Sequence, residues 1–362
     1  MADRREPNKN RICEVLRDRT IKASAPCRID MGGTLDISSL FYPLARLEPC
    51  TFNIALDMRT TATVGSFKPG MVKVESRGFK HACYRLEEMP FDHPLGLMFA
   101  VAACFSIDGI SIEIESASPP KSSLGGSSSA AVALVGAYSA LLEAAGLQGN
   151  KIETTAVLAQ GIEQSIAGVP CGMQDQLAAA YGGINAWHWV EESGRPGWRR
   201  QNLDDPVWPG QINDCILVAY CGIPHESADI NGTWIRRFLA GKDRSHWADI
   251  IGTTRKFVAA FAGGDIESAA KFMNRETRIR RQITPHVVDD IGAALIEAAE
   301  AANCGARFAG AGGGGCLWAL GPQQAISGLR SDWEKIVKTR PGASVLETRV
   351  DPEGIRKCMY RT

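Results

Sequence analysis

The chain has 362 residues, of which 45% are apolar and 22% charged, and its formal net charge at pH 7 is zero. This length exceeds one typical hydrophobic core, so we expect two domains, and the composition excludes a disordered chain. A chain without net charge has no overall attraction for nucleic acid or for an anionic membrane, and we expect neither as a partner.

The cysteines and the N-terminal residues indicate in which cellular compartment the protein is expected. The eleven cysteines include no C-x-x-C pair, which is typical of reduced thiols rather than of a disulfide framework or a zinc site. The opening residues, MADRREP, lack the apolar segment of a signal peptide. The sequence also has no run of about eighteen apolar residues, so we expect no membrane span. We therefore expect a soluble, cytoplasmic protein.

The first predicted strand leads into a glycine turn with charged neighbours. Residues 1–20 are strongly charged and are predicted to form a short helix or tail, and residues 22–36 (KASAPCRIDMGGTLD) then alternate into a Gly-Gly turn. Arg28 is a fixed cation suited to oxyanions, whereas Asp30 and Asp36 accept hydrogen bonds from hydroxyl groups. The same residues also fit a plain hairpin with a surface ion pair.

A Gly/Ser-rich segment, residues 118–130 (SPPKSSLGGSSSA), joins a predicted strand to a long helix predicted over 131–145. The start of a helix offers unpaired N–H groups and the positive end of its dipole to a phosphate, and small residues let that anion approach. An ordinary N-capped helix after a flexible loop is the alternative. Before this segment we predict a buried helix over 94–105 and strands over 51–57, 59–64, 71–75 and 109–115.

The middle of the chain carries two acidic candidates. Glu163 lies near the end of a helix predicted over 152–166, and Asp175 starts a short helical run that ends before a tryptophan-rich strand. Asp175 fits either a helix cap or a catalytic carboxylate. Residues 191–212 are polar and make the best joint between domains, which we place at 1–205 and 206–362.

The C-terminal part is predicted to hold a buried strand over 215–220 and two or three helices between Trp234 and Glu300. The basic segment 274–281 (NRETRIRR) fits a solvated helix face better than a phosphate site. Residues 310–315 (GAGGGG) precede a short apolar strand. Five glycines in six positions indicate a backbone packed closely against a loop or a ligand.

Taken together, four segments resemble the GHMP small-molecule kinases, which include galacto-, homoserine, mevalonate and phosphomevalonate kinases. The segments are residues 25–36, 122–130, 171–183 and 310–315. The resemblance implies an α+β, two-domain GHMP kinase fold, in which a ribosomal protein S5 domain 2-like N-terminal domain precedes the GHMP C-terminal domain. Within the family the chain looks most like the sugar kinase branch, with galactokinase and the D-glycero-D-manno-heptose 7-phosphate kinases.

The resemblance implies an ATP- and Mg²⁺-dependent kinase that phosphorylates a hydroxyl group of a sugar or sugar phosphate. The anomeric C1 hydroxyl is the expected acceptor. Transfer would be direct and in line, by a monomer or homodimer. Two rivals stay open: an ATP-dependent decarboxylase of the same family, and a non-catalytic sugar-binding regulator. A dinucleotide site is not expected, because residues 312–315 are no G-x-G-x-x-G opening a βαβ unit.

The same resemblance assigns roles to single residues. Asp175 would accept or orient the acceptor proton, with Arg28 keeping that carboxylate ionised, and Ser127 and Glu163 would ligate Mg²⁺. The nucleotide-binding residues would be Ser122, Ser123, Leu124, Gly125, Gly126, Ser127, Ser128 and Ser129. The substrate-binding residues would be Asp30, Gly32, Gly33, Asp36, Gly312 and Gly313.

This sequence departs from the usual family pattern at two places. Arg28 and Asp36 lie one residue closer together than is usual, which leaves open whether Asp30 or Asp36 contacts the sugar. Lys121 and Ser123 stand where glycines are frequent. Lys121 either contacts phosphate or faces solvent.

Overall fold

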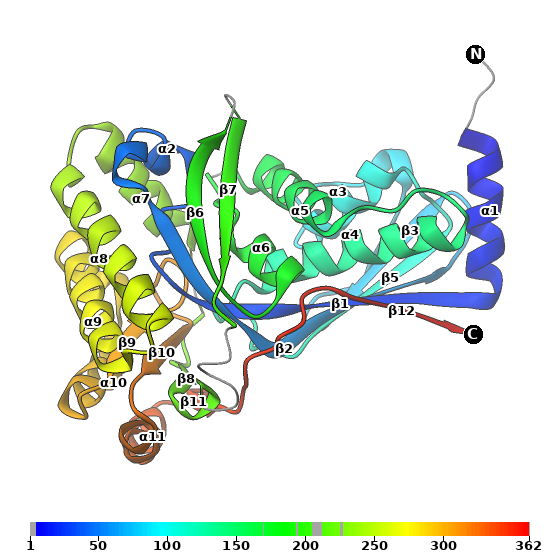
Figure 1. Ribbon diagram of the computed structural model, residues 1–362. Coiled ribbons are helices and arrows are strands. Elements are labelled where there is room, and N and C mark those ends of the chain that lie inside the picture. The colour runs from blue at the N-terminus through cyan, green and yellow to red at the C-terminus, as the bar shows by residue number, and fades with distance from the viewer. Residues whose placement is uncertain (1–4, 169, 193–194, 205–211, 225–226, 362) are drawn as a thin grey trace.

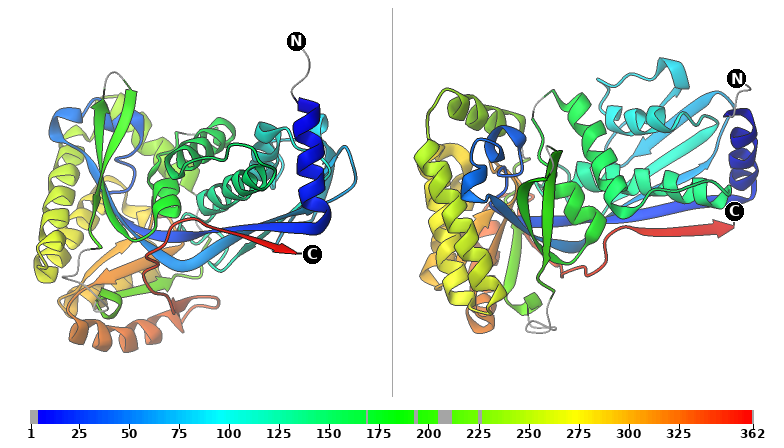
Figure 2. Two further views of the ribbon diagram at one scale, coloured as in Figure 1. Left: turned by 45° about the vertical axis from the view of Figure 1, so that its right-hand side comes forward. Right: turned by 45° about the horizontal axis from the view of Figure 1, so that its top comes forward.

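The computed structural model describes residues 5–168, 170–192, 195–204, 212–224 and 227–361. It contains two sheets, each with its own set of helices, that lie side by side along the long direction of the molecule (Figures 1 and 2). The predicted α+β class is thereby confirmed. The predicted boundary between residues 205 and 206 falls at 205–211, outside the described residues, and the division stays a prediction.

The larger sheet has eight strands in the order β12-β1-β2-β5-β3-β4, with β6 paired to β2 and β7 to β6. All its pairs are antiparallel except β3 with β5. Its strands are β1 (Arg19–Met31), β2 (Cys50–Ser66), β3 (Met71–Ser76), β4 (Ala82–Arg85), β5 (Ile110–Ser116), β6 (Ile184–Glu192), β7 (Arg195–Asn202) and β12 (Arg356–Arg361).

Two sequence predictions for this sheet need correction. The strands predicted over 51–57 and 59–64 are one strand, β2, whose pairing with β1 shifts register opposite Pro26 and Cys27. Residues 195–202 of the predicted polar joint form β7, which pairs with β6 along its length. Polar residues form a strand there because β6 supplies the partner hydrogen bonds.

Helices cover one face of this sheet, as Figure 1 shows for α3 to α6. They are α1 (Arg5–Asp18), α3 (Gly96–Phe105), α4 (Gly126–Ala144), α5 (Ile152–Ala167) and α6 (Gln174–Tyr181). The short helix α2 (Ser38–Phe41) instead packs against α7 (Ser227–Leu239). Among the described helices only α4 is long and apolar enough to cross a membrane, but 72% of it is buried inside the fold. Its apolar side chains therefore form the core under the sheet.

The second sheet is antiparallel, in the order β11-β8-β10-β9. Its strands are β8 (Ile216–Tyr220), β9 (Gly305–Phe308), β10 (Cys316–Leu320) and β11 (Ser344–Leu346). Its helices are α7 (Ser227–Leu239), α8 (Arg244–Ala262), α9 (Ile266–Ile283), α10 (Asp290–Ala301) and α11 (Gln323–Val337). In the described chain α7 to α10 thus replace the two or three helices predicted between Trp234 and Glu300.

An aromatic cluster fixes the two sheets against each other. Phe52 of β2 lies 5.0 and 4.8 Å, between ring centroids, from Phe257 and Phe261 of α8 and 6.5 Å from Trp318 of β10. All four side chains are buried, and burying rings of this size contributes about 2–3 kcal/mol each. This contact holds β1, next to β2, in a fixed place relative to the glycine run between β9 and β10.

Candidate active site

The Gly/Ser loop ends at an uncapped helix N-terminus. Helix α4 begins at Gly126, and the N-cap residue Gly125 has a left-handed φ of 75° and no side chain to cap the helix. The N–H of Ser129 donates to the Gly125 carbonyl oxygen at 2.9 Å. The three N–H groups before it have no intrahelical acceptor, so they and the helix dipole favour an anion. The ordinary side-chain-capped helix that the sequence allowed does not form.

The glycine run packs on this loop, as predicted. The Cys316 N–H donates to the Ser122 carbonyl oxygen at 2.8 Å, and the Ser123 hydroxyl donates to the Ala309 carbonyl oxygen at 2.8 Å. A Cβ at Gly315, where φ is 82°, would lie 2.7 Å from the Ser122 carbonyl oxygen. A side chain there would push the loops apart. Lys121 is exposed, and its contact with phosphate stays a prediction.

Arg28 and Asp175, which lie 147 residues apart in the sequence, form a two-point ion pair. The Nε and Nη2 atoms of Arg28 donate to the two carboxylate oxygens of Asp175 at 2.8 and 2.9 Å, and Nη1 donates to the Ser123 carbonyl oxygen at 2.5 Å. The Arg28 side chain is 5% exposed and that of Asp175 25% exposed. Arg28 therefore holds the carboxylate from the buried side and leaves its other edge accessible.

The electrostatic setting keeps Arg28 charged. Burial lowers the pKa of Arg28, but the neighbouring carboxylates of Asp175 and Asp30 outweigh burial and raise that pKa overall. A Cβ at Gly125 would lie 3.3 Å from Oδ2 of Asp175. The carboxylate is thus next to the start of α4, where an anion would bind.

The Glu163 carboxylate accepts hydrogen bonds from three donors. Its Oε1 accepts from the Ser127 hydroxyl at 2.6 Å, and its Oε2 accepts from the Ser128 hydroxyl at 2.8 Å and the Gln176 amide at 2.6 Å. Burial raises the pKa of Glu163, and the bonds from the two serines oppose that rise. The structure brings the two predicted metal ligands, Ser127 and Glu163, into direct contact.

These oxygens fit the chemistry of Mg²⁺. The ion takes hard oxygen ligands and is usually held by one or two carboxylates together with substrate phosphates and water. No group of three or more His, Cys, Asp or Glu side chains placed to hold a metal occurs among the described residues. Ligation of Mg²⁺ by Ser127 and Glu163 stays a prediction.

The two aspartates near the glycine turn have different surroundings. Asp30 is fully buried, and its carboxylate accepts from the Gly310 N–H at 2.6 Å and from Arg307 Nη1 at 3.0 Å. Asp36 is 7% exposed, and its carboxylate accepts from the Gln174 N–H, next to Asp175, at 3.0 Å. The geometry thus favours Asp36 over Asp30 for contact with an acceptor.

The turn itself lies between α7 and the sheet. Gly32 accepts from the Thr51 hydroxyl at 3.2 Å, and the Thr34 hydroxyl lies 3.5 Å from the Asn231 side chain of α7. The Gly313 N–H donates to the Val287 carbonyl oxygen at 2.7 Å, and Gly312 also packs on Val287. Contact of Gly32, Gly33, Gly312 and Gly313 with a substrate stays a prediction.

The surroundings of Asp36 predict how the stability of the protein depends on pH. Burial, helped by nearby Asp175, raises its pKa from 3.8 to about 6. The folded protein therefore binds a proton that the unfolded chain releases between about pH 4 and 6, so this group costs stability as the pH rises through that window. We expect Asp36→Asn to raise the free energy of unfolding at about pH 8, by on the order of 2 kcal/mol, and to have no such effect near pH 4.

Urea unfolding of both proteins at about pH 4, 6 and 8 measures this difference. Asp332→Asn is the control, because that carboxylate is 59% exposed. A stability gain from Asp36→Asn that is the same at all three pH values would contradict the raised pKa.

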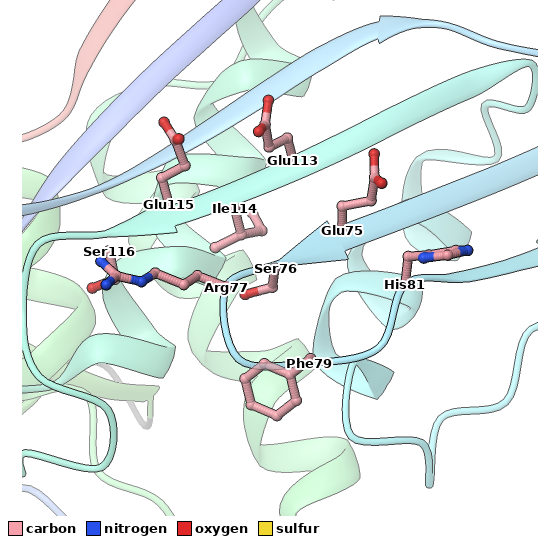
Figure 3. Close-up of a pocket in the computed structure, with 9 residues that line it drawn as sticks. All are labelled: Glu75, Ser76, Arg77, Phe79, His81, Glu113, Ile114, Glu115 and Ser116. Atoms are coloured by element: carbon pink, nitrogen blue, oxygen red, sulfur yellow. The ribbon is translucent and has the colours of Figure 1, made fainter.

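A surface hollow lies at the end of β5 that leads to the Gly/Ser loop. It has a volume of about 410 Å³ and is lined by β5, the end of β3 and the turn that follows β3 (Figure 3). Phe79 of that turn is 51% exposed. The Ser116 hydroxyl at the wall of the hollow lies 3.0 Å from that of Ser118, where the loop begins. The hollow and the loop therefore adjoin.

The basic segment of α9 differs from its prediction. Arg278 is solvated, with 64% of its side chain exposed, but Arg280 is completely buried and donates to Glu276 and to the Gly33 carbonyl oxygen. Glu276, Arg307 and Gln176 were not predicted as site residues. The sequence did carry a signal for Glu276, because Glu276 and Arg280 are four residues apart, the spacing of an ion pair on a helix. For Gln176 the available signal was its position directly after Asp175.

The fold described above is that of the GHMP kinases. Residues 93–183 match the family described as "GHMP kinases N terminal domain". The matched segment lies in the N-terminal part of the chain, and the whole chain has the GHMP kinase fold.

Three known proteins illustrate the similarity. The mevalonate kinase of Pyrococcus abyssi is 23% identical, over 93% of this chain and 98% of that protein. The structure of Lactococcus lactis galactokinase complexed with galactose is 17% identical, covers 98% of this chain and 99% of its own, and has a TM-score of 0.71. A D-glycero-D-manno-heptose 1-phosphate kinase from Bacteroides thetaiotaomicron is 14% identical, with coverage of 93% and 98% and a TM-score of 0.67.

Proposed function

We propose that this protein transfers the γ-phosphoryl group of ATP to the anomeric C1 hydroxyl of a sugar or sugar phosphate. The observation that carries the proposal is the Asp175 carboxylate, held by Arg28 on its buried side and exposed on its other edge beside the N-terminus of α4. That arrangement puts a proton acceptor next to a phosphate site, as phosphoryl transfer to an alcohol requires.

The nucleotide would bind along the surface described above. The N–H groups at the start of α4 would bind the phosphates, and Ser127 and Glu163 would hold Mg²⁺, which neutralises phosphate charge when bound. The hollow lined by β5 would take the nucleoside, with exposed Phe79 as a surface for the base. ATP and Mg²⁺ are available in the cytoplasm, where we propose that the protein acts.

The reaction requires few steps from the protein. Asp36 and the turn before it would hold acceptor hydroxyls, and Asp175 would take the proton as the acceptor oxygen forms its bond to the γ-phosphorus. The bond from that phosphorus to the β-γ bridging oxygen breaks, and ADP leaves. Arg28 would stabilise the ionised Asp175 until it takes this proton. No covalent enzyme intermediate is needed.

The charges around the acceptor side favour a neutral polyol at the reacting end. Burial, together with three nearby carboxylates, those of Glu163, Asp175 and Asp36, raises the pKa of Cys171 to about 12. An acceptor entering among three carboxylates would be repelled if its reacting end were anionic. A sugar hydroxyl carries no such charge.

The decisive experiment is a screen for ADP release with monosaccharides, their phosphates and mevalonate-type acids, followed by ³¹P and ¹³C NMR of the product. We expect turnover with a sugar or sugar phosphate and a product phosphorylated at C1. Release of CO₂ would identify the decarboxylase alternative. Binding of a sugar without any ADP release would identify the regulator.

A further inference from the structure

A chain of buried charges runs from the C-terminal helices to the candidate active site. Four of its members, Asp30, Glu276, Arg280 and Arg307, are completely buried. Arg307 of β9 donates to Glu276 at 2.9 Å through Nε and to the Asp30 carboxylate at 3.0 Å through Nη1. Arg307 therefore links α9 to β1, an element of the other sheet.

One end of the chain reaches the residue that holds Asp175. The Oδ1 atom of Asp30 lies 3.6 Å from Nη1 of Arg28 and accepts from the Gly310 N–H at 2.6 Å. Arg28 in turn makes the two-point contact with Asp175. Asp30 thus fixes both Arg28 and the first glycine of the run that packs on the Gly/Ser loop.

The other end reaches the glycine turn. Arg280 donates through Nε to Glu276 at 2.8 Å and through Nη2 to the Gly33 carbonyl oxygen at 2.6 Å. Its guanidinium lies 4.8 Å from the ring centroids of both Trp234 and Trp247. These two aromatic rings and the hydrogen bonds, with a longer one of 3.5 Å from Nη1 to the Thr34 hydroxyl, hold this arginine in a single orientation.

The signs of charge alternate along the chain: Asp175, Arg28, Asp30, Arg307, Glu276 and Arg280. Three positive and three negative charges balance, so none is buried without a partner. Buried ion pairs often add little stability compared with well-packed apolar residues, because desolvation offsets their attraction. Stability alone is therefore a poor reason for so many of them at the contact between the two sheets.

We propose that Arg280, Glu276 and Arg307 are positioning residues. They hold the glycine turn at Gly33 and the Arg28–Asp175 pair in a fixed position relative to each other. This inference rests on the proposed kinase function. Arg280 determines where the turn, and hence Asp36, lies. Arg307 acts through Asp30 on Arg28. None of the three touches the reacting groups.

The substitution Arg280→Lys tests this positioning role. Lysine keeps the positive charge but lacks the second N–H donor group, which in arginine reaches the Gly33 carbonyl oxygen. Arg278→Lys is the matched control: it is the same substitution, two residues away on α9, at a side chain that is 64% exposed. We expect KM for the acceptor to rise about tenfold or more in Arg280→Lys, with KM for ATP changed less than about twofold. Arg278→Lys should behave as wild type.

Hydrogen exchange supplies a measurement that does not depend on activity. In Arg280→Lys we expect faster exchange confined to peptides covering residues 31–41, and no change in Arg278→Lys. Equal exchange in that segment, or faster exchange spread over the whole chain, would overturn the proposal. If wild type phosphorylates no acceptor, the kinase function fails, while the exchange result still decides whether Arg280 positions the turn.

A second variant covers the case in which Arg280→Lys does not fold. The double variant Glu276→Gln, Arg280→Met removes one charge of each sign and leaves Arg307 paired with Asp30. It should fold, exchange faster over residues 31–41 and show the same selective rise in KM for the acceptor. Wild-type exchange and kinetics in this variant would rule out the positioning role.

Discussion

Replacing Asp175 with asparagine is expected to lower kcat by about 10³-fold or more, since general-base catalysis and orientation of the acceptor are lost together. Asparagine has the same shape but does not take up a proton. ATP affinity should change less than about threefold, because the phosphate site at the start of α4 does not depend on this side chain. Steady-state ADP release measures the first quantity, and calorimetric titration with a non-hydrolysable ATP analogue measures the second.

Two comparisons make the Asp175 result specific. Asp332→Asn makes the same chemical change at an exposed carboxylate of α11 and should leave both quantities unaltered. Thermal unfolding identifies any loss caused by releasing Arg28 from its partner. A folded Asp175→Asn protein that keeps more than about a tenth of wild-type kcat would exclude Asp175 as the base.

Local sequence signals sufficed for most of the fold. The alternation in residues 109–115 and the Ala/Leu-rich run after the Gly/Ser segment predicted β5 and α4, because side-chain periodicity and helix propensity act over a few residues. The strand β7 was not predicted, since its sequence RPGWRRQN has neither property. It forms because β6 pairs with it, and such pairing is set by the rest of the molecule.

Part of the candidate site could likewise be predicted from local sequence signals, and part of it could not. The Gly/Ser loop, the Gly run and Asp175 carry recognisable residue patterns, and the resemblance to GHMP kinases placed Arg28 with them. The burial of Arg280 was not predictable from the basic segment, because Arg278 and Arg280 differ only in which face of α9 they occupy. Only the positions of Trp234, Trp247 and the turn at Gly33 make one face a binding site for a guanidinium.

Replacing Glu163 with glutamine is expected to lower kcat/KM for ATP by about 10²-fold or more and to remove the effect of Mg²⁺ on ATP binding. In glutamine the carbonyl oxygen can replace Oε2 as the acceptor for the Ser128 hydroxyl and the Gln176 amide, and the new NH₂ group can donate to the Ser127 hydroxyl oxygen, so the fold should persist. What is lost is the negative charge, and a divalent ion binds an amide oxygen far less strongly than a carboxylate.

Titration of ATP with and without Mg²⁺ separates this loss from general damage to the site. In wild type Mg²⁺ should tighten ATP binding, whereas in Glu163→Gln the two affinities should converge on that of metal-free ATP. Glu153→Gln, at an exposed position in the first turn of the same helix α5, should retain the full Mg²⁺ effect. If Glu163→Gln also retained it, the ion would be bound by the nucleotide and other groups, and the assignment of Glu163 as a ligand would be wrong.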